Sequence, residues 1–517
     1  MYQIIDRFPV QGTFVLFIIF SIFYLLVFTY TTTSTEEKYL AYATGSNNGV
    51  AQNSDEDEVI LNPIIKNNPN LRVEEVSDGL DFPTSMAFLG PDDILVLEKN
   101  DGTVRRVLNG ELLEEPLLNV NVANEGERGM LGITIAEKDR SIGENDNDNN
   151  SRITYVFLYF TESVDQDDGD DNNNGEAVRN RLYRYELSQD KQELVNPRLL
   201  LDLPATPGPT HNGGKLVIGP DNNIYLTVGD VGEHDLPNPS TIVNVEGGPE
   251  PDGEAGILRV TQDGEAVQIT DGEGIEREEE DDDSSILGDK YPLNLYYAYG
   301  IRNSFGIDFD PVTGKLWDVE TGRNLGEEVN LVEPGFNSGW IKAQGIWDLD
   351  RMLQPTGIAS PDDESFISQL VDFDGRGKYS SPGFTWGKMP IATSGAAFFH
   401  SDRLGKQYEN DLFVGEFVNG IIFDFDLSQD RARLSFDNNG PLKDKVANDA
   451  EELEEIIFGH GFGGITDIKI GPYDGYMYVL SLDRGGDECK PQYPERSCIP
   501  YSSTEEGHIF RIVPASN

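Results

Sequence analysis

Residues 211–230, HNGGKLVIGPDNNIYLTVGD, predict a β-hairpin, with short apolar runs on either side of the turn formers at 220–223. Pairing the two runs places Asp230 opposite Gly213, two residues from His211, at the open end of the hairpin. A carboxylate beside an imidazole fixes the ring tautomer and stabilises the imidazolium, as a general base requires. A loop-capping histidine and a turn-closing aspartate explain the same pattern equally well.

Strand-like runs around a Gly, Pro or Asp turn recur along the chain and predict a repeated antiparallel unit. The six stretches are 89–107, 131–162, 218–230, 309–322, 395–427 and 470–486. Such units cannot bury their faces alone, and arranging them around an axis protects their edges. Because the chain also holds 54 Gly and 28 Pro, we expect an all-β fold, a six-bladed β-propeller. An array of two-sheet sandwiches is the alternative.

The 517-residue chain carries 92 acidic and 39 basic residues, a formal net charge of −53. This balance disfavours nucleic acid as a partner, because phosphate binding needs basic patches. A heavily solvated surface explains the charge most simply, and cation binding is the other reading. The acidic tracts at 143–150, 164–176 and 276–285 lack the spacing of an EF-hand. We therefore expect them to be long loop insertions.

Residues 13–30, TFVLFIIFSIFYLLVFTY, are almost wholly apolar. A run of this length lies between a long signal-peptide core and a short membrane span. We expect an N-terminal apolar helix within 1–31, serving as a signal peptide or membrane anchor and placing the bulk of the chain outside the cytoplasm. A polar linker over 32–69 and the propeller over 70–517 complete the expected domain organisation.

The cysteine and histidine content limits the chemistry. Cys489 and Cys498 are the two cysteines of the chain, and they fit either a disulfide in an extracytoplasmic protein or two free thiols. The five histidines show no metal-ligand spacing, which disfavours transition metals. The sequence holds no G-x-S-x-G, no P-loop and no strand–GxGxxG–helix unit. Serine hydrolysis and nicotinamide chemistry therefore have no local support.

Three further stretches are candidates for a site. Arg302 and Asn303, within YAYGIRNSFG, offer several donors suited to a carboxylate or to a carbonyl that gains negative charge. An arginine that bonds loop carbonyls is the simpler alternative. Residues 320–348 mix carboxylates with a Gly-rich loop, and Ca²⁺ takes six to eight such oxygen ligands; a solvated acidic turn is the alternative. Residues 126–132, GERGMLG, form a tight turn before a strand.

Five motifs in order resemble one known family. They are GERGMLGITIA, HNGGKLVIGPDNNIYLTVGD, GIRNSFGIDFDPVTGKLW, ETGRNLGEEVNL and IKIGPYDGYMYVLS…HIFRIVP. Together they look like the soluble PQQ-dependent sugar dehydrogenases, the glucose/sorbosone dehydrogenase group that includes aldose sugar dehydrogenases. The resemblance covers roughly residues 70–514. It implies a six-bladed propeller, PQQ and Ca²⁺ as cofactors, a sugar substrate oxidised at C1 to the lactone, and an external electron acceptor.

The resemblance also implies roles for individual residues. His211 takes the proton from the C1 hydroxyl of the sugar, and Asp230 orients and charge-stabilises His211. Arg302 polarises the quinone carbonyl that accepts hydride, and Asn303 helps hold the cofactor. The remaining positions are the main-chain carbonyls of Gly322 and Arg323 for the Ca²⁺ at the quinone, Glu328 and Asp348 for a neighbouring Ca²⁺, and Glu127 and Glu327 near the substrate.

The chain departs from the family at four positions. Glu127 stands where the family has Gln, Val418 stands in place of a cofactor-binding Lys, and Gly464 and Thr466 stand in place of two Arg. A hydrogen bond to a charged group contributes about 1.5–3 kcal/mol. Losing three cations beside the quinone carboxylates therefore predicts weaker PQQ binding. Two alternatives stay open: a non-catalytic, Ca²⁺-containing propeller that serves as a binding module, and a Ca²⁺-dependent lactonase.

Overall fold

The computed structural model describes residues 61–139, 152–164, 176–232, 244, 251–269, 285–323, 325–348, 366–387, 391–483 and 506–515. In these residues nearly all regular structure is β-strand, and the α-helix α4 (Ala450–Leu453) is only four residues long. No described helix has the length and apolar character needed to cross a membrane. The expected N-terminal apolar helix, both cysteines and most of the three acidic tracts lie outside the described residues.

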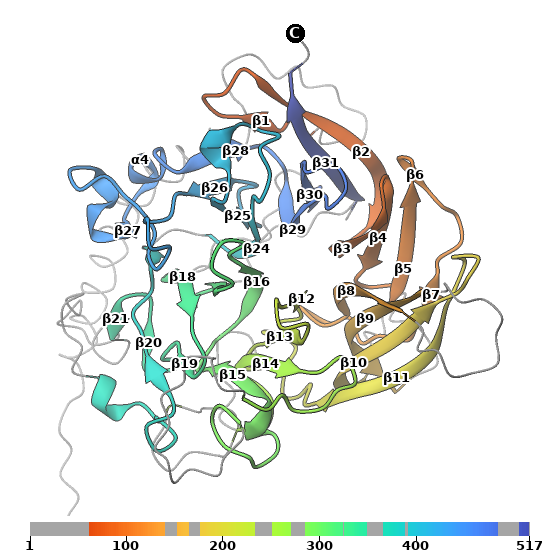
Figure 1. The fold of residues 1–517 in the computed structure, drawn as a ribbon, viewed down its shortest axis with the longest axis horizontal. Helices are drawn as coiled ribbons and strands as arrows, with labels where there is room; N and C mark the ends of the chain where they lie inside the picture. Colours follow the sequence, from red (N-terminus) through yellow and green to blue (C-terminus); the bar gives the residue numbers. More distant parts are fainter. Residues whose placement is uncertain are drawn as a thin grey trace, which may run out of the picture.

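The first three sheets in chain order begin as antiparallel meanders (Figure 1). The first contains β3 (Pro83–Gly90), β4 (Asp93–Glu98), β5 (Thr103–Leu108), β6 (Glu111–Leu112) and β7 (Leu118–Asn119). The second contains β8 (Met130–Asp139), β9 (Arg152–Ser163), β10 (Ala177–Leu187) and β11 (Leu194–Leu203). The third contains β12 (Leu216–Ile218), β13 (Ile224–Val228), β14 (Gly256–Val260), β15 (Tyr296–Tyr299), β19 (Phe336–Asn337) and β22 (Lys378–Tyr379).

Three more sheets follow. The fourth contains β16 (Ser304–Phe309), β17 (Leu316–Glu320), β18 (Glu327–Val332), β23 (Phe384–Trp386) and β27 (Val446–Ala447). The fifth contains β24 (Thr393–Phe398), β25 (Leu412–Glu416), β26 (Ile422–Phe425), β28 (Ile457–His460) and β1 (Ile64–Ile65). The sixth contains β29 (Gly464–Ile470), β30 (Met477–Leu482), β31 (Glu506–Pro514) and β2 (Leu71–Asp81). A separate two-stranded ribbon joins β20 (Ala343–Gln344) to β21 (Trp347–Asp348).

The inner strands of successive sheets form a closed ring. β3 contacts β8, β8 contacts β12, β12 contacts β16, β16 contacts β24, β24 contacts β29, and β29 contacts β3. Figure 1 shows the sheets radiating from this centre, which is the arrangement of a β-propeller. The prediction of an all-β propeller is therefore confirmed, and the two-sheet sandwich alternative is not observed.

The sequence predicted six blades, one for each repeated stretch. The described residues form six sheets of four to six strands, apart from the two-stranded ribbon, and each repeated stretch lies in a different one. The sixth sheet takes its outer strand from the start of the chain, because β2 pairs with β31 and Leu71 lies opposite Pro514. β1, which lies in the stretch predicted as a polar linker, pairs with β28. Sheet pairing thus begins before residue 70.

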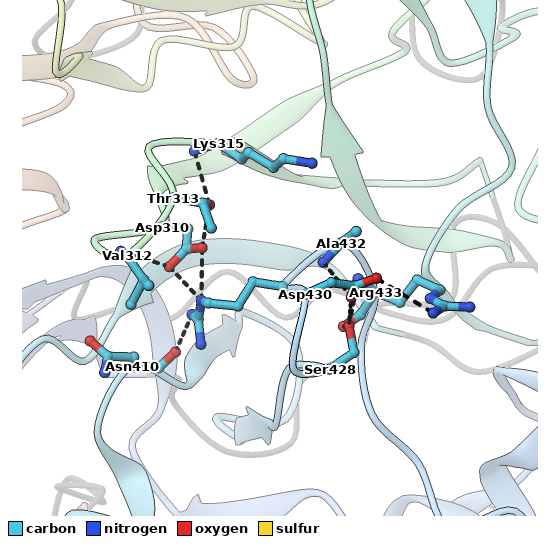
Figure 2. A network of polar contacts seen from close by, with 10 residues as sticks. Asp310, Val312, Thr313, Lys315, Asn410, Ser428, Asp430, Ala432 and Arg433 are labelled. Atoms are coloured by element: carbon cyan, nitrogen blue, oxygen red, sulfur yellow. Dashed lines mark hydrogen bonds and ion pairs between the residues drawn. The ribbon is translucent and has the colours of Figure 1, made fainter.

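A buried ion pair joins the fourth sheet to the fifth (Figure 2). Asp310 follows β16, and Arg431 lies in the turn after β26. Arg431 Nε donates to both oxygens of Asp310 at 2.8 Å, and its Nη2 donates to the carbonyl of Asn410 at 2.6 Å. Thr313 and the N–H of Val312 donate to the same carboxylate. Burial raises the pKa of Asp310, but these donors more than offset it, and the pKa lies below its usual value.

Candidate active site

The hairpin predicted from residues 211–230 is present as β12 and β13. Its register pairs Leu216 with Leu226, so Asp230 lies opposite Asn212 and not opposite Gly213 as predicted. The shift does not separate the pair, because the ring Nδ1 of His211 lies 2.6 Å from Asp230 Oδ1. Both side chains are buried, at 4% and 1% exposure. His211 also has a φ of 61°, a left-handed conformation that is strained for a residue with a side chain and is frequent at functional sites.

The contact determines which ring nitrogen of His211 is free. An ionised carboxylate only accepts hydrogen bonds, so Nδ1 carries the proton in the neutral ring. Nε2 then holds a lone pair and can take a proton from a bound hydroxyl group. The second oxygen of Asp230 accepts a hydrogen bond of 2.8 Å from Trp340 Nε1. The arrangement is that of an oriented general base.

Arg302 and Asn303 lie directly against this pair. The N–H of Asp230 donates to the carbonyl of Arg302 at 2.9 Å. A Cβ placed on Gly229 would lie 2.3 Å from the His211 carbonyl and 2.8 Å from both the Arg302 carbonyl and Asn303 Oδ1, so only glycine allows this approach. The structure therefore brings together the four residues to which the sequence assigned catalysis and cofactor binding.

The guanidinium of Arg302 is buried and only partly engaged. Its Nη1 donates to the carbonyl of Thr321 at 3.0 Å, its carbon lies 5.6 Å from the ring centre of Trp340, and its Nε is buried with no hydrogen-bond partner. Burial lowers the pKa of Arg302, and four nearby carboxylates oppose that effect. These are Asp230, Glu127, Glu327 and Glu320. The unpartnered Nε of Arg302 is therefore available to donate a hydrogen bond to a carbonyl or carboxylate oxygen of a ligand.

Glu127, expected near the substrate, connects the two halves of the site. Its Oε2 accepts from the N–H of His211 at 2.7 Å and from Asn303 Nδ2 at 3.0 Å. Asn303 Oδ1 in turn accepts from the N–H of Gly213 at 3.3 Å. One carboxylate oxygen thus fixes the loop that carries His211 to the strand start that carries Arg302.

Four buried carboxylates lie on β17 and β18, two of them (Glu320 and Glu327) close enough to act on the pKa of Arg302, and we call the four the acidic cluster. Its members are Asp318, Glu320, Glu327 and Glu328. Burial raises the pKa of Glu327 to about 8 and that of Asp318 to about 7. Burial and mutual repulsion raise the pKa of Glu320, and burial raises that of Glu328. One oxygen of Glu327 and one of Asp318 are buried without a hydrogen-bond partner.

The predicted calcium residues lie around this cluster. Gly322 and Arg323 form the turn that joins β17 to β18, and a Cβ on Gly322 would lie 2.2 Å from the Leu325 carbonyl. Glu328 accepts hydrogen bonds from Asn330 and from the N–H of Gly345. Asp348 lies on β21, and its side chain is outside the described part. In the part of the chain that is described, no three His, Cys, Asp or Glu side chains surround one point as metal ligands.

Val418, one of the positions that depart from the family, lies next to a further buried acid, Glu416. The N–H of Val418 donates to Glu416 at 2.8 Å, and Glu416 raises the pKa of Glu327 after the larger effect of burial. The Thr466 hydroxyl donates to the Leu480 carbonyl at 3.3 Å. Neither Val418 nor Thr466 supplies a cation to the site.

The sequence reading missed Trp340 and a second ion pair in the centre of the ring. Lys215 Nζ contacts Asp467, whose other oxygen accepts from the Ser85 hydroxyl and the N–H of Met86, both at 3.1 Å. This network joins the third, sixth and first sheets. The sequence around Lys215 and Trp340 contains no local pattern that predicts these contacts.

Comparison with known proteins adds to this geometry. Residues 80–489 match the family described as Glucose / Sorbosone dehydrogenase. The chain is 26% identical over 422 residues to an aldose sugar dehydrogenase of Escherichia coli (strain K12), covering 81% of this chain and 92% of that protein.

Solved structures of sugar dehydrogenases share the fold. The apo form of the soluble aldose sugar dehydrogenase from Escherichia coli superposes with a TM-score of 0.55 at 22% identity, over 86% of this chain and 100% of the other. The PQQ-bound aldose sugar dehydrogenase from Streptomyces coelicolor gives 0.51 at 19% identity, over 86% and 98%. Since the family match spans most of the chain and includes the hairpin and the acidic cluster, this protein belongs to the glucose/sorbosone dehydrogenase family.

Proposed function

We propose that this protein is a quinoprotein oxidoreductase that oxidises an aldose at C1 to the lactone, with PQQ and Ca²⁺ as cofactors and an external electron acceptor. The observation that carries the proposal is the buried contact of 2.6 Å between His211 Nδ1 and Asp230 Oδ1, directly against the strand start that holds Arg302. Family membership supports the reaction class. The sugar substrate follows from the family and from the relative in Escherichia coli.

In this proposal His211 Nε2 removes the proton of the C1 hydroxyl while C1 loses its hydrogen together with the bonding electron pair, as hydride. Asp230 stabilises the positive charge that His211 gains. PQQ, when bound, supplies the two-electron acceptor, and Ca²⁺ supplies a Lewis acid that polarises it. Arg302 donates toward oxygen that gains negative charge, and burial of the site keeps water from competing for these donors.

The residues present fit a carboxylated quinone and a calcium ion in part. The buried Nε of Arg302 has no partner and is available to an oxygen acceptor. No member of the acidic cluster is paired with a Lys or Arg among the described residues. The carbonyls of Gly322 and Arg323 would hold the Ca²⁺ at the quinone, and the carboxylates of Glu328 and Asp348 would hold a neighbouring Ca²⁺. The unpartnered oxygen of Glu327 is suited to a sugar hydroxyl, and Glu127 would complete the substrate side. Val418, Gly464 and Thr466 offer no cation, so PQQ affinity should be low for the family.

Reconstitution tests the proposal. The purified protein is mixed with PQQ and CaCl₂, offered a panel of aldoses with a dye acceptor, and compared with His211→Gln. We expect dye reduction that falls about 10²–10⁴-fold in the variant while PQQ uptake is retained. His508→Gln is the matched control, because His508 also pairs with a carboxylate, Glu75 at 2.8 Å, on the outer strands of the sixth sheet. Its turnover should equal that of the unaltered protein.

Other outcomes would replace the proposal. Absence of PQQ uptake at micromolar cofactor, with Ca²⁺ still bound, would favour the non-catalytic binding module. Hydrolysis of a sugar lactone without dye reduction would favour the Ca²⁺-dependent lactonase. Full turnover in His211→Gln would remove His211 from the mechanism.

We further propose that this chemistry takes place outside the cytoplasm. The support is the apolar run at 13–30, which has the character of a signal peptide or a membrane anchor. Fractionation of cells that express the full chain with a C-terminal tag tests this. Activity confined to the cytoplasmic fraction would contradict it.

A further inference from the structure

Trp340 touches both sides of the candidate active site. Its indole Nε1 donates to Asp230 Oδ2 at 2.8 Å, and its ring lies 5.6 Å from the guanidinium carbon of Arg302. The side chain is buried, at 6% exposure. The Trp340 side chain thus contacts both the carboxylate behind His211 and the guanidinium of Arg302.

The backbone of Trp340 is fixed independently of the indole. Its N–H donates to the carbonyl of Gly300 at 2.9 Å, two residues before Arg302. Its carbonyl accepts from Asn244 Nδ2, also at 2.9 Å. Because both backbone groups are bonded to neighbouring elements, the ring is held in place from outside the catalytic residues.

The indole donor constrains the rotation of the Asp230 carboxylate. With Oδ2 held by Trp340, Oδ1 faces His211 Nδ1, and the proton stays on that nitrogen. The face of the same ring attracts the guanidinium of Arg302, whose Nη1 is held by Thr321. One aromatic side chain therefore couples the tautomer of the base to the position of the cation.

We infer that Trp340 is a positioning residue of this site, which orients Asp230, and through it His211, while it aligns Arg302. This inference rests on the proposed function for its effect on turnover. Its effect on the His211 ring does not, since that effect exists without substrate or cofactor.

The test compares two buried tryptophans. Trp340→Phe keeps an aromatic ring and removes the N–H donor. Trp386→Phe is the matched control, because Trp386 is fully buried and its Nε1 has no hydrogen-bond partner. In the reconstituted protein we expect turnover to fall about tenfold or more in Trp340→Phe, the loss expected for a hydrogen bond to a charged group. The KM for sugar should change by less than about threefold, and Trp386→Phe should keep the turnover of the unaltered protein.

A spectroscopic readout separates this inference from the proposed function. The chain has five histidines, so ¹⁵N-histidine labelling gives few ring signals, and His211→Gln assigns the one of interest. We expect the Nδ1–H proton signal of His211 to be shifted downfield in the unaltered protein and in Trp386→Phe, and to be lost or moved upfield in Trp340→Phe. This pattern in a protein that reduces no dye would support the positioning role while the dehydrogenase proposal fails.

If Trp340→Phe does not fold, replacing Trp340 with benzothienylalanine keeps the bicyclic shape and exchanges the N–H for sulfur. The same two measurements then apply. An unchanged His211 signal together with unchanged turnover, in a folded variant that lacks the donor, would overturn the inference.

Discussion

Two groups of buried carboxylates in this propeller differ in whether each carboxylate is paired with a cation. Between sheets, Asp310 is paired with Arg431 and Asp467 with Lys215. In the acidic cluster beside Arg302, no member has an ion pair with a Lys or Arg among the described residues. The pKa of Asp310 is lowered by its donors, whereas burial raises the pKa of Asp318 to about 7. Uncompensated charge of this kind is costly for folding and is typical of a ligand site.

The largest expected effect comes from breaking a pair between sheets. Asp310→Asn removes the charge that neutralises Arg431, which is mostly buried, and should lower the free energy of unfolding by about 3–5 kcal/mol. Urea denaturation measures the loss, and turnover per folded molecule should stay unchanged. The same substitution at Asp318 should be neutral or stabilising at pH 8, because it removes an uncompensated buried acid. Equal losses in the two variants would contradict the distinction.

The next effect concerns the cation beside the acidic cluster. Arg302→Ala should lower turnover about 10²–10³-fold, the range found for loss of a donor to developing charge, with a smaller change in sugar affinity. Steady-state kinetics on the reconstituted protein measures both. Arg431→Ala is the matched control, since it removes a buried guanidinium from the sheet boundary and should affect stability alone. An unchanged turnover number in Arg302→Ala would exclude its proposed role.

A smaller effect is the pH dependence of stability without calcium. The pKa of Asp318 is raised to about 7 in the folded chain, so between pH 4 and pH 7 the folded form holds a proton that the unfolded form has lost. Stability should therefore fall as the pH rises through this window, by at most about 1.4 kcal/mol per pH unit for this group. Melting curves in EGTA at stepwise pH measure the slope, and Asp318→Asn should reduce it. A slope of the same size in the variant would show that Asp318 does not contribute.

The smallest effect is expected at Glu127. Glu127→Gln restores the family residue and keeps an amide oxygen that can accept from His211 and Asn303. The change in turnover should be under about threefold and in stability under about 1 kcal/mol. Steady-state kinetics with several aldoses measures the change in turnover and any change in the preference among the sugars. A loss above tenfold would mean that the charge of Glu127 is itself required.

The sequence revealed the sheet fold and much of the site because those features are local. Turn formers between apolar runs predict hairpins, and one hairpin suffices to bring His211 near Asp230. The register was wrong by one residue, since turn composition does not fix which residues of the turn are unpaired. The pair remained in contact because both residues lie beyond the strand ends, where side chains can adjust.

Contacts between sheets could not be predicted in this way. Lys215 and Asp467, which form an ion pair, are 252 residues apart in sequence. Trp340 lies 110 residues from its partner Asp230. Neither contact leaves a trace in the local pattern. The acidic residues 320–348 were noted, yet their burial was not predicted, because charged residues at high density usually lie in solvent. Only the placement of β17 and β18 inside the fourth sheet, next to its inner strand β16, shows that these acids are buried.

The pairing of β2 with β31 has a consequence for synthesis of the protein. Among the described strands, β2 is the second to leave the ribosome and its partner β31 is the last. Until then β2 has an open edge, and each finished sheet exposes an apolar flank to the next. The nascent chain should therefore depend on chaperones for most of its translation, and a truncation that removes residues 506–515 should yield aggregates in place of a smaller folded propeller.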